Sequence, residues 1–541
     1  MTPPSAGAGT GTADGSRVPA GRAVRRATAA TARRRSDAGI GQLLGDLYYA
    51  LIMVAIGIGM ALGVVEVARD ALRPAPVVPA PGPDLGLPSL AGLAVLGFVG
   101  VVLSLAGRLG PVGVGAAEAT WWLPLPVDRR GLLRPTAARL PLLAGGVGAL
   151  VLVLVDLTVQ GYGGTSADRL VRFGALGGLG TAALVLLAGV GQSLGAVRRR
   201  IAAAGHASVA LVPVLAVVGA LTGWRLEALP SPGAVVLAVL TVVVVAAAVA
   251  LDRRLGRIPG RDLRESGSIS SQAVGAVVSL DSRELGRTLV EGAARPRRRR
   301  SARFGAVRSA SAAVVAADVA LLVRSPRHVV QVLGATVAPA VVLVVPELAS
   351  TAVLAIVLVG SGYVAMLAGA EGARRAEMAP VLDRLLPLSA RRVRVLRTAV
   401  PGAVAVVWSL GAFAAVAQLH GDLADGGAEG LMAWLALGLA SAPVWAGAAV
   451  RSAYRPAPDW AGPLVSTPAG AVPLGVLAVL SRGPDVVALG LVPVLIALLL
   501  GAAPVPVLVA QGVASAIVVA VCVRLPATAA GGAGAGAGGA R

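Results

Sequence analysis

The chain has no lysine, because all 48 basic residues among its 541 residues are arginine. A phosphate-binding loop of the form GxxxxGK[ST] needs a lysine to reach the β- and γ-phosphates of a nucleotide. A serine–lysine catalytic dyad needs a lysine as its base. The sequence therefore excludes a conventional P-loop ATPase and a serine–lysine hydrolase.

Cysteine and histidine are scarce. The single cysteine, Cys522, lies in the last apolar stretch and cannot form an internal disulfide, so we expect it to pack as a small hydrophobic side chain. The histidines, His206, His328 and His420, lie far apart, whereas a zinc site of the HExxH kind needs two on one helix. We expect no metal, no cofactor and no catalytic residue.

Charge is also sparse: 14% of the residues are charged, whereas 56% are apolar. One globular core cannot enclose that much apolar surface. The net charge is +21, and the arginines stand in short clusters between apolar stretches of membrane-spanning length. We interpret them as positive-inside loops beside anionic headgroups, not as a nucleic-acid-binding surface. The sequence predicts an all-α, multi-pass protein of the plasma membrane with lipid as its main solvent.

Twelve apolar stretches have about the length needed to cross a bilayer. The first six are 44–66, 88–107, 140–160, 172–195, 207–224 and 233–251. The second six are 329–346, 349–370, 398–419, 430–450, 485–502 and 504–523. With the N-terminus in the cytoplasm, roughly 43 of the 48 arginines fall on the cytoplasmic side, in line with the positive-inside rule. The interval 461–480 is apolar but broken by prolines, and we expect a re-entrant or interfacial piece that keeps Arg482 and Arg524 inside.

The spans divide the chain into two six-helix halves with polar segments around them. We expect a disordered cytoplasmic tail over 1–39, a first half over 40–251, a cytoplasmic linker over 252–310, a second half over 311–524 and a disordered tail over 525–541. Residues 311–323 form either an interfacial helix or the first turns of the seventh span.

Two loops share a sequence pattern, and each follows the second span of its half. Both 116–134 and 376–397 contain Leu-Pro-Leu, then arginines, then Leu-Arg. Setting Leu123 against Leu386 also pairs Arg129 with Arg392 and Arg134 with Arg397. Internal symmetry of this kind is typical of transporters built from two equivalent bundles.

The second loop resembles a known family. Its residues 371–392 read Glu-Gly-Ala-Arg-Arg-Ala-Glu-Met-Ala-Pro-Val-Leu-Asp-Arg-Leu-Leu-Pro-Leu-Ser-Ala-Arg-Arg. This is similar to the first cytoplasmic loop of ABC-2-type permeases, where an acidic, glycine-containing stretch leads into Leu-Pro-Leu-Ser-x-Arg. In that family the segment is a short coupling helix that docks on a separate ATPase subunit, within a half-transporter of six spans. The first loop departs from the pattern, because it carries Trp121-Trp122 and lacks the acidic lead.

The resemblance implies a fused pair of halves that accepts two ATPase subunits. We therefore expect a permease subunit of an ATP-driven exporter, not itself an enzyme, powered by an ABC-type ATPase in trans. Apolar side chains would enter a groove on that partner while arginines steer an acidic rim. The expected docking residues are Glu118, Trp121, Trp122, Arg129, Arg130, Glu377, Leu386, Arg391 and Arg392. The alternative is that both loops are simply proline-started helix N-termini with positive-inside arginines.

Three acidic residues fall inside predicted spans, where charge is costly. Asp46 and Glu66 lie near opposite ends of the first span, and we expect their carboxylates to reach the interfaces. Asp156 lies deeper, and together with Gln160 one turn later it is a candidate for lining a polar transport path.

Small residues recur in the fourth span, at Gly174, Gly177, Gly178 and Gly180. They suit close helix packing in lipid, although the general Gly/Ala bias of the chain explains them equally well.

A secondary transporter of the major-facilitator kind is the alternative function. It too has twelve spans and a long central loop, and its Asp-Arg-x-Gly element is partly matched by residues 128–131. Pro124 stands where that element requires a glycine, and the few charges inside the spans argue against ion coupling. A membrane enzyme acting on lipid substrates is a third class, for which we find no catalytic constellation.

Overall fold

The structure is a computed structural model of the whole chain. It describes residues 20–35, 40–71, 85–161, 164–195, 198–278, 305, 307–420, 423–454, 463–467, 470–473 and 481–524. Within these ranges the chain is helical apart from its connections and one short pair of strands, which confirms the all-α class.

The chain forms two compact units that are interleaved in sequence. Unit 1 comprises 1–69, 94–209 and 229–297, and unit 2 comprises 70–93, 210–228 and 298–541. This division differs from the predicted boundary between the halves, because two segments that precede the linker belong to unit 2. One buried cluster in unit 2 explains the difference: Leu85, Leu93 and Ala216 pack with Val345. The amide of Leu85 also donates to the carbonyl of Val344 at 2.9 Å.

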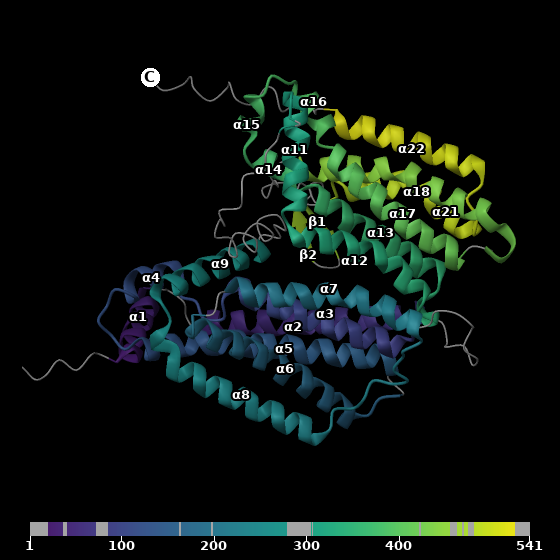
Figure 1. Cartoon of the computed structure of the whole chain (residues 1–541). Helices are drawn as coiled ribbons and strands as arrows, with labels where there is room; N and C mark the ends of the chain where they lie inside the picture. The colour runs from purple at the N-terminus through teal and green to yellow at the C-terminus, as the bar shows by residue number, and fades with distance from the viewer. Residues whose placement is uncertain are drawn as a thin grey trace, which may run out of the picture. The chain divides into compact units, whose positions relative to one another are not determined.

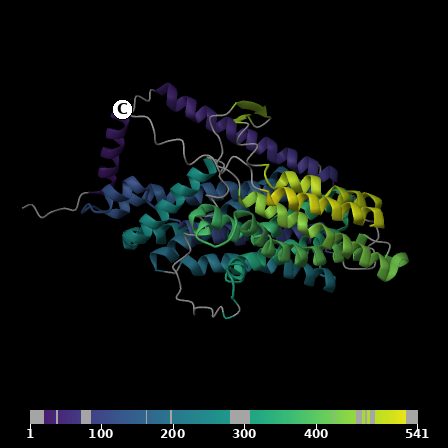
Figure 2. The ribbon, with the colours of Figure 1, turned by 90° about the horizontal axis from the view of Figure 1, so that it is seen from above.

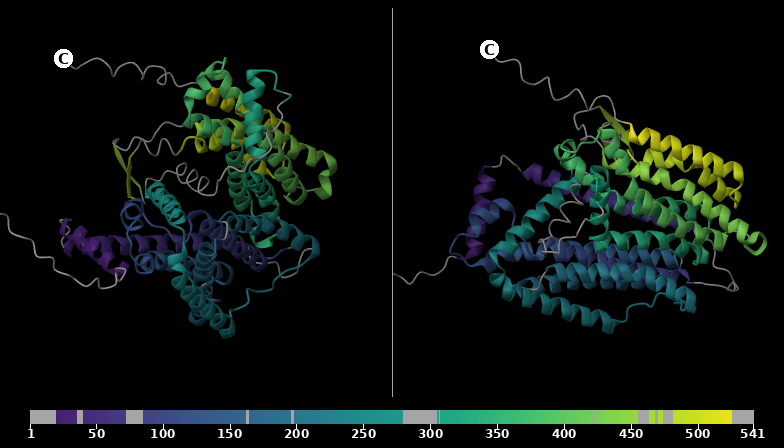
Figure 3. Two further views of the ribbon diagram at one scale, coloured as in Figure 1. Left: turned by 60° about the vertical axis from the view of Figure 1, so that its left-hand side comes forward. Right: turned by 45° about the horizontal axis from the view of Figure 1, so that its top comes forward.

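Unit 1 is built on long helices. In chain order these are α1 (Gly21–Arg35), α2 (Ile40–Ala71), α3 (Leu87–Leu109), α4 (Ala116–Trp122), α5 (Arg129–Gln160), α6 (Ala167–Ser193), α7 (Arg198–Thr222), α8 (Ala234–Arg254), the 3-10 turn η1 (Leu255–Arg257) and α9 (Gly260–Val278), with α3 and α7 each giving one end to unit 2. Helix α5 packs along α6, and α6 along α8 (Figures 1 and 3). Polar side chains start these helices: the Asp128 carboxylate accepts the amides of Arg130 and Gly131 at the start of α5.

Unit 2 contains the remaining elements. They are α11 (Ala310–Val323), α12 (Pro326–Leu343), η2 (Pro346–Leu348), α13 (Thr351–Gly369), α14 (Glu371–Met378), α15 (Pro380–Arg384), α16 (Ala390–Leu396), α17 (Ala399–His420), α18 (Leu423–Ala453), β1 (Leu464–Thr467), β2 (Gly470–Pro473), α20 (Pro484–Gly490), α21 (Val492–Leu500) and α22 (Val505–Val523). Helix α18 packs against α17 and α22 (Figures 1 and 2). Its core holds Trp408 edge-on to Trp445, with ring centroids 5.3 Å apart. The Trp408 indole N–H donates to the Ala335 carbonyl at 3.2 Å, so its polar atom is satisfied.

Among the described residues, nine helices are long and apolar enough to cross a membrane, or ten if α11 and α12 count as one bent span. The chain is therefore a multi-pass helical protein, as predicted, but this count is lower than the predicted twelve. Two predicted spans, 44–66 and 485–502, are missing from this count. Helix α2 covers 44–66 but is not among the helices counted. The span 485–502 is divided between the short helices α20 and α21 at Leu491.

Two polar segments differ from their predicted state. Residues 21–35 of the predicted disordered tail form α1, and residues 260–278 of the predicted linker form α9, which buries Leu263 and Ile269. The described part of 461–480 is an antiparallel strand pair, with Leu464 opposite Pro473. Residues 311–323 form α11, which is bent from α12 by 78° and so does not continue that helix in a straight line. The predicted C-terminal tail, 525–541, lies outside the described residues.

Candidate functional site

The first loop folds into a tight turn that leads directly into a long helix. The amide of Leu125 donates to the Trp122 carbonyl at 3.3 Å, and the amide of Val127 donates to the Leu125 carbonyl at 2.9 Å. Asp128 follows at once and caps α5. The turn therefore fixes how the chain enters α5.

The second loop repeats this turn. The amide of Leu386 donates to the Asp383 carbonyl at 3.2 Å, and the amide of Leu388 donates to the Leu386 carbonyl at 2.7 Å. Ser389 follows and caps α16 by accepting the amide of Arg392 at 3.3 Å. The two loops thus share the same bonds at the same spacing, each ending in a capped helix.

The shared hydrogen bonds align the two loops in a register that differs from the register of their sequence alignment. They make Leu125 equivalent to Leu386, whereas the Leu-Pro-Leu alignment places Leu123 there. Arg130 then corresponds to Arg391 and Arg134 to Val395, whereas the Leu-Pro-Leu alignment pairs Arg129 with Arg392 and Arg134 with Arg397. In both loops a proline stands one residue before the second amide donor, Pro126 in the first loop and Pro387 in the second.

In the first loop one tryptophan is exposed and the other is buried. Trp121 has 74% of its surface exposed, whereas Trp122 has 8%. The Arg25 guanidinium lies over the Trp122 ring, 5.5 Å from its centroid. Glu118 accepts the amide of Gly115 at 3.4 Å and so closes the start of α4. Of the apolar residues predicted to dock in this loop, only Trp121 is available to a partner.

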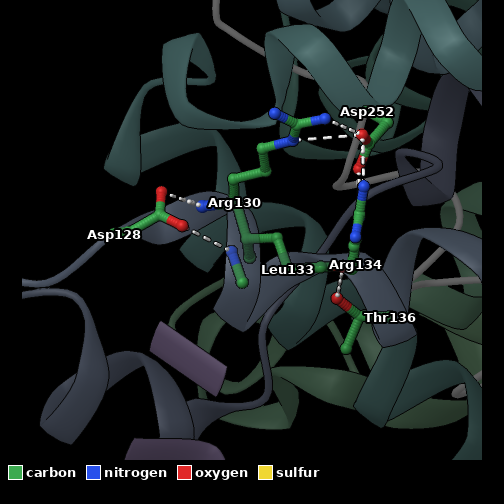
Figure 4. A network of polar contacts seen from close by, with 7 residues as sticks. Asp128, Arg130, Leu133, Arg134, Thr136 and Asp252 are labelled. Carbon is green, nitrogen blue, oxygen red and sulfur yellow. Dashed lines mark hydrogen bonds and ion pairs between the residues drawn. The ribbon is translucent and has the colours of Figure 1, made fainter. Parts of the chain in front are cut away.

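Arginines at the start of α5 bind the end of α8 (Figure 4). Nε of Arg130 donates to Asp252 at 3.0 Å, and Nη2 of Arg134 donates to the same carboxylate at 2.8 Å. Asp252 lies three residues before η1, at the C-terminal end of α8. This shared carboxylate ties the helix that leaves the first loop to α8. Arg129, which was also predicted to dock, is half-buried.

The second loop exposes a different set of apolar side chains from the predicted one. Leu385 is 76% exposed, and Met378 and Val381 are exposed as well, whereas the predicted Leu386 is half-buried. Arg391 and Arg392 are exposed, and Glu377 is half-buried. The exposed apolar side chains of this loop are therefore Met378, Val381 and Leu385, and the exposed Arg391 and Arg392 follow them in sequence.

Arg397, at the end of α16, joins the second loop to α11. Its Nη1 donates to Asp318 and its Nη2 to Asp383, each at 2.8 Å. Asp318 is almost fully buried, and Gly372 packs so closely that a Cβ there would lie 2.0 Å from an Asp318 oxygen. No sequence pattern predicts this cluster, because Asp318 and Arg397 are 79 residues apart.

Glu371 opens the loop helix α14 as a charged acceptor. Nε of Arg375 donates to it at 3.1 Å. Burial alone would raise the pKa of Glu371, but this hydrogen bond and the charges of Arg375, Arg374 and Arg327 outweigh burial and hold that pKa below its usual value.

The predicted polar path begins at a buried ion pair. Asp156 is fully buried, and it accepts bonds from Nε of Arg169 at 2.9 Å and from the Thr165 hydroxyl at 3.0 Å. It lies one turn before α5 ends at Gln160, which is half-buried. A role in transport stays a prediction for both residues. Glu66 is exposed, and the side chain of Asp46 is not among those described.

One pentapeptide, Gly191–Gly195, has the GxSxG spacing of a hydrolase nucleophile. That nucleophile sits in a sharp turn between a strand and a helix, whereas Ser193 ends α6 and donates its hydroxyl to the Val190 carbonyl at 2.7 Å. In the described part of the chain, no group of three His, Cys, Asp or Glu side chains is arranged to hold a metal ion.

Comparison with known proteins gives one match. A family model described as "Family of unknown function (DUF6297)" matches residues 85–463. No curated protein and no solved structure matches the chain. The matched residues include both loops and begin after α1 and α2.

Proposed function

The chain belongs to the DUF6297 family, whose function is unknown, and from its own geometry we propose that it is the permease subunit of an ATP-driven, ABC-2-like exporter. A separate ABC-type ATPase supplies the energy and docks on residues 116–134 and 376–397. The N-terminus lies in the cytoplasm, and the chain crosses the plasma membrane twelve times in two related six-helix halves.

The repeated turn is the observation that carries this proposal. Two segments 261 positions apart, by the numbers of Leu125 and Leu386, make the same backbone hydrogen bonds and the same capped helix start. A positive-inside loop needs only arginines, and nothing in that rule requires one turn geometry in both loops. Two copies of one turn suit a partner with two equivalent subunits, and the exposed apolar side chains stand at different positions in the two turns.

The side chains on both turns have the chemistry of a docking surface. Trp121 and Leu385 each expose about three quarters of their surface, and exposed arginines lie near Leu385 in sequence. Aromatic and apolar anchors carry most of the energy of protein interfaces, with arginines favoured among the polar residues. Trp121 and Leu385 are therefore the anchors of this proposal, in place of Trp122 and Leu386.

Ion pairs join the helix that follows each turn to a neighbouring helix of the same unit. In unit 1, Arg130 and Arg134 link the start of α5 to the end of α8 through Asp252. In unit 2, Arg397 links the end of α16 to α11 through Asp318. A rigid-body movement of a docked ATPase would reach two helices in each half, the usual scale of domain-level switching.

The test compares two anchor substitutions with a matched control. Trp121→Asp and Leu385→Asp, made together in the full chain, place a charge at both anchors. Trp224→Asp makes the same change at a tryptophan that is 55% exposed in the connection after α7. Membranes from the native host are solubilised, the protein is purified, and the bound ABC-type ATPase is quantified by mass spectrometry and by ATP hydrolysis.

Wild type and Trp224→Asp should retain the ATPase, whereas the double variant should lose it. Two anchors of about 2 kcal/mol each weaken binding on the order of a thousandfold. Equal retention in the double variant contradicts the docking assignment. Proton-driven uptake by vesicles that contain this chain and no ATPase contradicts the proposed function and favours a major-facilitator-like carrier.

A further inference from the structure

Helix α1 has two chemically different faces. It carries six arginines and no acidic residue between Gly21 and Arg35. At 3.6 residues per turn, positions 22 and 26 lie about 40° apart around the helix. Arg22 and Arg26 are exposed, as is Arg34 farther round the helix. One side of α1 is thus a stripe of positive charge.

The other face holds α1 against the first loop (Figure 1). Nη1 of Arg25 donates to the Leu132 carbonyl at 2.9 Å, and its guanidinium covers Trp122. Val24 packs against the core cluster of unit 1. A Cβ on Gly21 would lie 2.0 Å from the Asp128 carbonyl oxygen, so a glycine is needed where α1 meets α5. The arginine stripe is therefore presented from a fixed position.

Helix α2 indicates what the stripe faces. It exposes large apolar side chains along its length, among them Leu44, Leu51, Met60 and Val67. Lipid is the solvent that suits such a surface. Only residues 36–39 separate α1 from α2, and that length of chain spans about 18 Å at most. The C-terminal end of α1 therefore lies within about 18 Å of the start of α2.

We propose that α1 binds anionic phospholipid headgroups through Arg22 and Arg26 while Arg25 holds it on the first loop. The stripe has the opposite charge to those headgroups, and basic helices beside a membrane helix are attracted to an anionic leaflet. Bound lipid then fixes α1 over Trp122 and leaves Trp121 exposed. This binding does not depend on the proposed ATPase, so each can fail separately.

The experiment measures how near α1 lies to headgroups in the full-length protein. In a Cys522→Ser background, Ala30→Cys on the exposed side of α1 carries a fluorophore. The protein is placed in nanodiscs of phosphatidylcholine alone or with phosphatidylglycerol, each with a quencher on the lipid headgroup. We expect stronger quenching in discs with phosphatidylglycerol than in discs of phosphatidylcholine alone, and loss of this difference at high salt.

Two double variants with the same charge change separate α1 from its surroundings. Arg22→Gln with Arg26→Gln should weaken the association of α1 with headgroups about twenty-five-fold, at roughly a factor of five per arginine. Arg253→Gln with Arg257→Gln removes two exposed arginines, one in the last turn of α8 and one in η1, and should leave the quenching in place. Equal quenching in neutral discs, or equal quenching of both double variants, overturns the proposal. Absence of quenching in every disc also overturns it and points to an acidic protein as the occupant.

Discussion

Loss of Arg397 should cost much of the stability. Its side chain is 10% exposed and its partner Asp318 is 4% exposed, so Arg397→Met leaves a buried carboxylate without its cation. We expect a loss of about 3–5 kcal/mol in the free energy of unfolding. Denaturant unfolding in detergent, followed by circular dichroism, measures it.

Two further variants define what that loss means. Adding Asp318→Leu to Arg397→Met removes the unpaired charge and should restore most of the stability. Arg130→Met breaks an ion pair whose arginine is 46% exposed, while Asp252 keeps Arg134, so it should cost no more than about 1 kcal/mol. Equal losses for Arg397→Met and Arg130→Met would show that burial of the cluster contributes nothing.

Glu371 should make stability depend on pH. Because its pKa in the folded state lies below the unfolded value of about 4.3, the ionised carboxylate stabilises the folded state above that value. This contribution is lost as the pH falls through the folded pKa. The Tm difference between wild type and Glu371→Gln should thus be largest near neutral pH and shrink below about pH 4. A difference that stays constant across that range contradicts this role.

The contact between α5 and α6 depends on particular glycines. A Cβ on Gly177 would lie 2.1 Å from the Gly148 carbonyl oxygen, whereas a Cβ on Gly180 meets nothing within 4 Å. Gly177→Ala should push the two helices apart and cost about 1–3 kcal/mol. Gly180→Ala, on the same helix, should be neutral or stabilise by up to about 1 kcal/mol. Thermal unfolding of both variants in one detergent makes the comparison, and equal effects would contradict close packing at Gly177.

Sequence pattern predicted the helices well and their exposed side chains poorly. Apolar stretches of spanning length recur because lipid imposes that length, and capping residues such as Asp128 mark helix starts. Trp121 and Trp122 are adjacent and identical in type, but one is exposed and the other is buried. The burial of Trp122 depends on Arg25, which belongs to α1 and lies far away in the sequence. The sequence alignment of the two turns also differs from their structural register, because backbone hydrogen bonds define that register and residue types do not.

The whole molecule should present Trp121 and Trp224 on opposite sides of the membrane. Trp121 comes after the C-terminal end of α3, where Gly107 packs closely on Ala202 of α7. Trp224 precedes Leu226, whose amide donates to Ser89 at the other end of α3. In a Cys522→Ser background, a membrane-impermeant thiol reagent should label Trp224→Cys in intact cells and Trp121→Cys only after lysis. Reversed labelling contradicts the proposed orientation.

At this scale the sequence predicted the class of protein and not its division into units. Arginine placement and apolar length indicate a multi-pass protein, but they carry no information on which helices pack together. Leu85 and Val345 form one cluster because of packing between segments on either side of the linker. No local pattern records such a pairing, and the predicted halves therefore differ from the compact units.

That cluster also sets an order of events during biosynthesis. Leu85 and Val345 are both fully enclosed in the finished protein, yet every residue between them must be translated before they can meet. At 5–20 residues per second the interval is on the order of tens of seconds. Throughout that time Leu85 lacks its packing partner Val345, and a chain truncated before Val345 never completes the cluster.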